Sequence, residues 1–159
     1  MKIDILCVGK IKENYFKEGV SEYSKRLSRY CDLKIIEVSD ESTKEECSEQ
    51  EKSLVLEKEG QRLEKYISPD AYLIALAIEG KQYTSEGLSA AMDDLMVRGN
   101  SHIQFVIGGS LGLSPKVLSR ANEKLSFSKL TFPHQLMRVI LLEQIYRSFR
   151  ISRKEPYHK

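Results

Sequence analysis

The eight residues Ala71–Ile78 (AYLIALAI) are apolar almost without interruption. A strand with one solvated face alternates apolar and polar side chains, so a continuous apolar run of this length indicates a strand covered on both faces. Such strands occupy the middle of parallel sheets, and their connections are helices that pack on the two faces of the sheet. The rest of the chain should therefore alternate further strands with helices.

The remaining sequence predicts this alternation. Strands are predicted at Lys2–Val8, Leu33–Val38, Ile103–Ile107 and Leu125–Phe127, and helices at Glu13–Arg29, Thr43–Tyr66, Thr84–Gly99, Ser114–Ala121 and Pro133–Phe149. Three of the helices have starting signals: a capping box formed by Thr43 and Glu46, a cap at Thr84 or Ser85, and Ser114 followed by Pro115. The order predicts a single α/β domain over residues 1–159, with an open, mostly parallel sheet and helices on both faces.

Size and charge fit one globular domain and say little about partners. The 159 residues are 41% apolar, which is enough for a substantial core, and the net charge is only +2. The distribution of charge is more informative, because seven Lys and Arg residues lie between Lys129 and Lys159 against two Glu residues. A basic end suggests a local anionic partner, although a solvated helix face followed by a basic tail explains it equally well.

Targeting signals and metal motifs are not evident. The first apolar segment is too short for a signal peptide, and no run approaches the length of a membrane span. Cys7, Cys31 and Cys47 form no CxxC pair, so we expect reduced thiols, with neither a disulfide framework nor a zinc site. The sequence predicts a cytoplasmic protein without a metal centre.

A glycine-rich turn, Gly108–Gly112 (GGSLG), follows the predicted strand Ile103–Ile107. It matches neither the Walker A pattern nor GxGxxG, so on its own a tight structural turn is at least as good an interpretation. Two other segments, Glu79–Gly80 and Ser128–Phe132, follow predicted strands and should reach the same carboxyl edge of the sheet, where open α/β sheets bind ligands. Main-chain groups from three such segments suit an adenine and a sulfonium cofactor better than a dianionic phosphate.

The last predicted helix carries most of the polar side chains that could do chemistry. His134 and Arg138 lie one turn apart near its start and share a face, although a capping or surface histidine is the ordinary alternative. Further along, a basic run is interleaved with aromatic residues, a combination that suits phosphate contact and base stacking: Arg147, Arg150, Arg153 and Lys154, with Tyr146, Phe149 and Tyr157. The closing residues Glu155–Lys159 (EPYHK) are richer in donors and stacking surface than a loose terminus.

Three segments, FVIGGSLGLS, LSFSKLTFPHQLMRVILLEQIYRSFRI and the closing PYHK, together resemble the RlmH family of small SPOUT-class methyltransferases. The similarity covers the whole chain, and Lys154 stands where many relatives have glycine. The resemblance implies an α/β-knot fold, in which the C-terminal segment threads through a loop, and a homodimer whose active site takes residues from both subunits. It also implies that S-adenosylmethionine is the cofactor and that the substrate is N3 of a pseudouridine in 23S ribosomal RNA. Because the chain has only 159 residues and one modest basic region, we expect it to act on the assembled ribosome rather than on free RNA.

The family's site residues map onto positions already selected from the pattern. The implied cofactor contacts are Leu76, Gly108, Gly109, Gly112, Phe127, Ser128, Lys129, Leu130, Thr131 and Phe132. The implied catalytic residues are His134, Arg138, Tyr157 and His158, with either histidine as the base and Arg138 holding charge on the ring oxygens or a phosphate. Arg147, Arg150, Arg153 and Lys154 are the predicted RNA contacts. A nucleotide-binding module without catalysis and a plain dimeric interaction domain are the alternatives, and calorimetry with S-adenosylmethionine, ATP and FMN separates them.

Overall fold

The computed structural model describes all residues from 1 to 159. Its five strands form one parallel sheet in the order β2-β1-β4-β3-β5. The strands are β1 (Lys2–Val8), β2 (Asp32–Val38), β3 (Tyr72–Gln82), β4 (His102–Ile107) and β5 (Glu123–Ser126). The helices are α1 (Asn14–Leu27), α2 (Glu49–Glu64), α3 (Ser85–Val97), α4 (Pro115–Arg120) and α5 (His134–Ser152). The α/β fold and its parallel sheet are as predicted.

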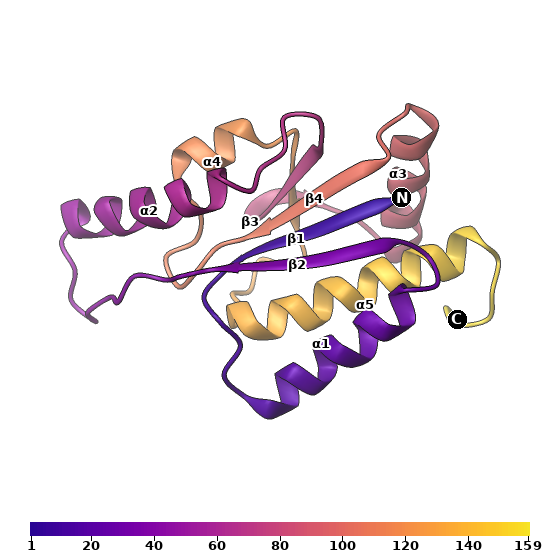
Figure 1. Cartoon of the computed structure of the whole chain (residues 1–159), viewed down its shortest axis with the longest axis horizontal. Coiled ribbons are helices and arrows are strands. Elements are labelled where there is room, and N and C mark those ends of the chain that lie inside the picture. The colour runs from indigo at the N-terminus through magenta and orange to yellow at the C-terminus, as the bar shows by residue number, and fades with distance from the viewer.

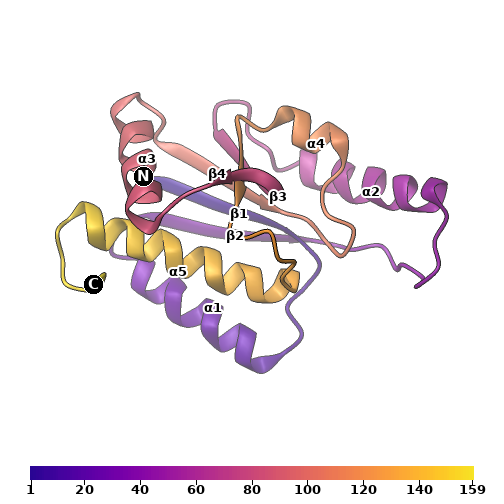
Figure 2. The same ribbon diagram turned by 180° about the vertical axis from the view of Figure 1, so that it is seen from behind.

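Helices cover both faces of the sheet, as Figures 1 and 2 show from opposite sides. α1, α3 and α5 pack on one face around Ile5 and Phe105, and α2 and α4 pack on the other around Leu6 and Val106. In β3, Ile74 joins the first core and Ala75 the second. The continuous apolar run therefore lies in a strand covered on both faces, which confirms the interpretation of its pattern. None of the helices combines the length and the hydrophobicity that a membrane span requires.

The helix caps confirm two predicted starts and correct a third. The side chains of Thr84 and Ser114 cap α3 and α4 by accepting hydrogen bonds from main-chain N–H groups. The capping box at Thr43 is wrong, because α2 begins at Glu49 and its cap is Ser48, which accepts from the N–H of Glu51 at 3.2 Å. Ser48 and Glu51 have the same spacing as Thr43 and Glu46, five residues later. The segment before Ser48 is not helical, and the N–H of Glu41 binds it to α2 by donating to the carboxylate of Glu59.

The ends of β3 and β5 also differ from the prediction. β3 was expected to end at Glu79–Gly80 but continues to Gln82, and β5 begins at Glu123 rather than Leu125 and ends one residue earlier. Leu125 pairs with both Leu76 and Lys81, so the residues between them form an irregular segment that crosses β5. A Cβ on Gly80 would lie 2.7 Å from the carbonyl carbon of Lys124, so this crossing requires glycine. Threading of the C-terminal segment through a loop stays a prediction from the family.

Candidate functional site

A cleft of about 690 Å³ opens at the carboxyl edge of the sheet. It is lined by the end of β3, the glycine turn after β4, the segment between β5 and α5, the start of α5 and one side of α2. Every residue predicted to contact the cofactor lines this cleft except Lys129, whose side chain is exposed and whose neighbours Ser128 and Leu130 line it. The structure therefore brings the three predicted segments together, and the ligand contacts themselves stay a prediction.

The glycine turn leaves main-chain groups facing the cleft. A Cβ on Gly108 would lie 2.3 Å from the carbonyl oxygen of Gly112, and Gly112 has a left-handed φ of +84°, so the turn excludes side chains at both positions. The N–H groups of Ser110 and Leu111 donate to no other main-chain group of the protein. The turn therefore supplies amides without a main-chain acceptor at the wall of the cleft.

The segment between β5 and α5 has the same character. The N–H of Leu130 bonds the side chain of Ser128 at 3.0 Å, and the hydroxyl of Ser126 donates to the carbonyl of Ser128 at 3.1 Å. The N–H groups of Phe127, Thr131 and Phe132 have no main-chain acceptor. These bonds fix the course of the segment and leave polar main-chain groups along the wall of the cleft.

His134 is the one predicted catalytic side chain that lines this cleft. It is the first residue of α5, and its Nε2 atom lies 3.6 Å from the position of a Cβ on Gly9. Burial and, next, the positive charge of Arg138 lower the pKa of His134, while Asp40 opposes the shift. The imidazole is therefore neutral near pH 7 and able to accept a proton.

Arg138 does not face the cleft. The residue is 1% exposed, and its guanidinium donates to a Glu37 carboxylate oxygen at 2.6 Å and to the carbonyls of Val8 and Gly9 at 3.0 and 2.7 Å. The shared helix face with His134 was predicted, but Arg138 points inward to the end of β1. In this structure its charge is paired with Glu37, and the one guanidinium nitrogen without a partner, Nε, is buried.

Tyr157 and His158 follow α5 and pack against its C-terminal half, away from the cleft. Figure 1 shows the C-terminus beside that end of α5. The Tyr157 hydroxyl donates to Glu143 at 2.9 Å, and burial followed by this bond raises its pKa. The His158 ring lies between Arg147 at 3.1 Å and Glu86 at 2.7 Å. Glu143 is nine residues beyond His134, roughly 14 Å along the helix axis. The tail is thus packed, and a single chain does not place it in its own cleft.

The predicted RNA contacts are largely occupied within the protein. Arg147 pairs with Glu143 through two donors at 3.0 and 2.6 Å, and Arg150 pairs with Glu155 at 2.6 Å. The Arg153 guanidinium lies 4.7 Å from the centre of the Tyr30 ring. Lys154 has a left-handed φ of +55°, the only residue other than glycine with a positive φ. These side chains fold the tail against α1 and α5, and their contact with RNA stays a prediction.

The sequence did not predict the residues that contact His134, the tail and the arginines of α5. Glu143 organises Arg147 and Tyr157, and its spacing of four residues from Arg147 on a helix is a signal that could have found that pair. Glu86, Asp40 and Tyr30 come from other elements, far from the tail or from His134 in sequence. No local pattern identifies such long-range neighbours.

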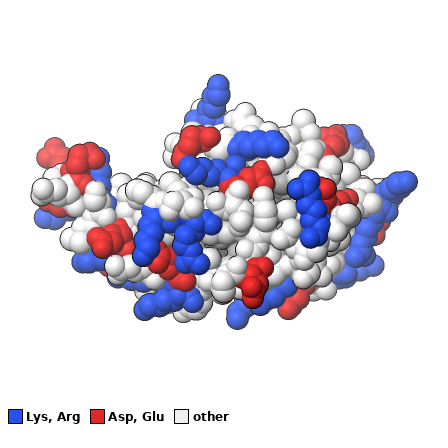
Figure 3. Space-filling model, turned by 90° about the horizontal axis from the view of Figure 1, so that it is seen from above, with Lys and Arg blue, Asp and Glu red and all other residues white.

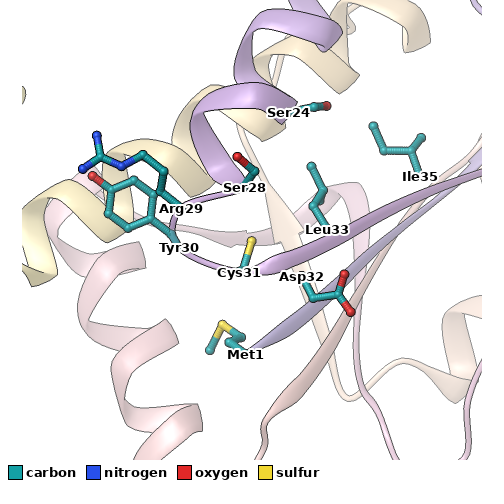
Figure 4. Close-up of a pocket in the computed structure, with 9 residues that line it drawn as sticks. All are labelled: Met1, Ser24, Ser28, Arg29, Tyr30, Cys31, Asp32, Leu33 and Ile35. Carbon is teal, nitrogen blue, oxygen red and sulfur yellow. The ribbon is translucent and has the colours of Figure 1, made fainter.

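A second hollow, of about 800 Å³, lies between the end of α1 and the start of β2 (Figure 4). Met1 and Asp32 in its wall mark the amino ends of β1 and β2, whereas ligands of open α/β sheets bind at the carboxyl ends. Burial raises the pKa of its thiol, Cys31, to about 11, so this cysteine is not a ready nucleophile. The cleft beside the glycine turn is the better candidate for the active site.

Comparison with known proteins identifies the family of this chain. The family model described as "Predicted SPOUT methyltransferase" matches residues 1–158. The chain belongs to this family. Relatives named ribosomal RNA large subunit methyltransferase H are 60% identical in Bifidobacterium adolescentis and 58% identical in Clostridium acetobutylicum and Bacillus pumilus. Each alignment spans all 159 residues of this chain and the full length of the relative. The resemblance to the RlmH family is therefore confirmed.

The fold of this SPOUT methyltransferase is also found in a solved structure. A probable methylase family protein from Haemophilus influenzae superposes with a TM-score of 0.56 over 99% of this chain and 70% of that one. The two sequences are only 12% identical, so this likeness shows the fold alone.

Proposed function

We propose that this SPOUT methyltransferase transfers a methyl group from S-adenosylmethionine to N3 of a pseudouridine in 23S ribosomal RNA of the assembled ribosome. The observation that carries the proposal is the 60% identity, over the full length of both chains, to a ribosomal RNA large subunit methyltransferase H. The site geometry supports it independently, because the cleft combines main-chain donors with one neutral histidine at its rim.

The cleft fits the proposed cofactor. The adenosine would lie against the main chain of the glycine turn and of Phe127–Phe132, and Leu76 would form part of the apolar wall. A Cβ placed on Gly112 would meet nothing within 4 Å, so there is open space beside the backbone of the glycine turn. When bound, S-adenosylmethionine supplies an activated methyl group, so the task left to the protein is alignment and management of one proton.

The imide nitrogen of a uracil-type ring carries a proton and is a weak nucleophile until that proton leaves. His134 is suited to accept it because its ring is neutral near pH 7 and lies at the cleft. His158 is the second candidate, held by Arg147 and Glu86. Separate His134→Ala and His158→Ala variants identify the base: loss of methyl transfer with retained cofactor affinity assigns the role, and a loss of only a few-fold in both rejects it.

The separation of these histidines supports a homodimer. The packed tail lies roughly 14 Å along α5 from His134 in the same chain. The simplest way to bring Tyr157 and His158 to each cleft is therefore to take them from the tail of a second copy. We therefore propose a site composed of the cleft of one subunit and the tail of the other.

The substrate is proposed to be the folded ribosome in the cytoplasm rather than free RNA. With a net charge of +2 the protein has little general attraction for nucleic acid, and Figure 3 shows positive and negative side chains interspersed over the face seen from above. Such a small protein should read a preassembled surface. Methyl transfer to naked 23S transcript at a rate similar to that on ribosomes would contradict this part of the proposal.

The decisive experiment incubates ribosomes from a strain lacking this protein with labelled S-adenosylmethionine, then maps the label. Label on one pseudouridine of 23S RNA supports the proposal. Label elsewhere, or none, overturns it. Calorimetry with S-adenosylmethionine, ATP and FMN accompanies the assay, because binding of ATP or FMN alone indicates a nucleotide-binding module and binding of none indicates an interaction domain.

A further inference from the structure

The loop between β1 and α1, which passes the start of α5, carries two lysines that the structure leaves without a partner. Lys10 and Lys12 are exposed, and neither takes part in an ion pair. The charge of Lys12 is among the causes that lower the pKa of His134, so the two side chains are near each other. This contrasts with Arg147 and Arg150, whose guanidiniums are paired with carboxylates of the protein itself.

Hydrogen bonds fasten this loop to the start of α5. The Lys12 N–H donates to Gln135 Oε1 at 3.0 Å, and the Ile11 N–H donates to Glu37 Oε2 at 3.1 Å. In addition, the guanidinium of Arg138 on α5 donates hydrogen bonds to the carbonyls of Val8 and Gly9. Figures 1 and 2 both show the loop passing the first turn of α5. The loop is therefore held in one conformation before any partner binds, which lowers the entropy cost of binding through it.

None of the acids around the loop pairs with Lys10 or Lys12. Glu37 is neutralised by Arg138, and Asp40 lies beside Gly9 and His134. Glu13 is the only acid within the loop itself, and it lies at the end of the loop as the cap residue of α1. The two lysines are thus exposed and unpaired on a loop that lies beside His134, which lines the cleft.

We propose that Lys10 and Lys12 contact backbone phosphates of the ribosomal RNA next to the target nucleotide, and that the fastened loop holds them in position. The inference rests on the proposed function. It assigns phosphate contact to the cleft side of the molecule, whereas the sequence pattern assigned it to the basic run of α5. RNA phosphate fits better than an acidic protein segment because the contact lies beside the cleft that receives the base.

The test compares Lys10→Glu/Lys12→Glu with a matched control, Lys34→Glu/Lys58→Glu, which reverses two exposed lysines elsewhere. Co-sedimentation with ribosomal subunits measures binding without methylation, calorimetry measures cofactor affinity, and methyl transfer gives KM and kcat. We expect affinity for subunits to fall about tenfold or more in the loop variant and KM to rise accordingly, with cofactor affinity and kcat unchanged. The control variant should match the wild type.

The salt dependence of binding shows whether the loss of affinity for subunits comes from lost phosphate contacts. In Lys10→Gln/Lys12→Gln, the slope of log affinity against log salt concentration should decrease by roughly 1.5, the value for two lost phosphate contacts. An unchanged slope, equal losses in the loop and control variants, or a parallel loss of cofactor affinity overturns the inference. If the wild type binds subunits through the lysines but methylates no RNA, the proposed function fails and the phosphate contact stands.

Discussion

Replacing Arg138 with methionine tests whether this residue holds the fold or the substrate. The change removes a buried guanidinium that donates to Glu37 and to the carbonyls of Val8 and Gly9. Methionine fills much of the space but donates nothing, so two carbonyls at the end of β1 lose a donor and Glu37 loses its charge partner. Breaking a buried ion pair from one side costs about 3–5 kcal/mol.

The structure places the expected value near the lower part of that range. The Glu37 side chain is 34% exposed, against 2% for Arg138, so water can solvate the carboxylate that the substitution leaves behind. We expect a loss of about 3 kcal/mol in the free energy of unfolding, because the two buried carbonyls add to the cost. Against a typical total of roughly 5–15 kcal/mol, such a loss is large.

Urea unfolding of Arg138→Met, Glu37→Gln and the double variant measures this directly. The double variant should lose less than the sum of the single losses, because the first substitution already breaks the pair. Arg98→Met, which removes an exposed pair with Asp94, is the matched control and should hardly change the midpoint. An unchanged midpoint for Arg138→Met with a large loss of methyl transfer would refute this reasoning and restore Arg138 as a substrate-binding residue.

Three further substitutions test particular features. Lys154→Gly should stabilise the protein by about 0.5–1 kcal/mol in thermal unfolding, since φ +55° strains lysine but not glycine, and a lower midpoint would contradict this. Gly80→Ala should destabilise it by about 2 kcal/mol or more in urea, because a Cβ there meets the backbone of β5 at 2.7 Å, and a neutral effect would show that the crossing is loose. Burial raises the pKa of Glu59, so its contribution to stability is full below the unfolded pKa and is lost as pH rises through the folded value. Glu59→Gln should therefore lose less stability than the wild type between pH 4 and 7, and identical pH profiles would refute this.

The elements that could be predicted are those fixed by local pattern. Continuous apolarity at Ala71–Ile78 predicted a buried parallel strand, and Thr84 and Ser114 gave the true starts of two helices. The start of α2 was wrong because two positions offer the same capping pattern, and only packing against Glu41 and the sheet selects Ser48. β3 extends beyond its apolar run because backbone pairing with β5 continues through polar residues such as Lys81.

The candidate site also has features that local pattern predicted and features that depend on long-range contacts. Glycines and strand ends located the cleft, since the carboxyl edge of a parallel sheet follows from chain order alone. Helical spacing placed His134 and Arg138 on one face but could not tell that Arg138 turns inward, because its acceptors on β1 and β2 are more than 100 residues away. The position of the tail likewise depends on Glu143 and Glu86, which only the folded chain brings to Tyr157 and His158.

The central claim, a site made of one subunit's cleft and the other subunit's tail, is tested most directly by mixing two inactive variants. His134→Ala and His158→Ala chains are unfolded together and refolded, and methyl transfer to ribosomes is compared with that of each variant alone. Random pairing makes half of the dimers mixed, and each mixed dimer has one intact site of two, so the account predicts recovery of about a quarter of the wild-type activity. Activity no higher than the average of the separate variants would show that both histidines serve the same chain, or that one is not needed, and would contradict the account.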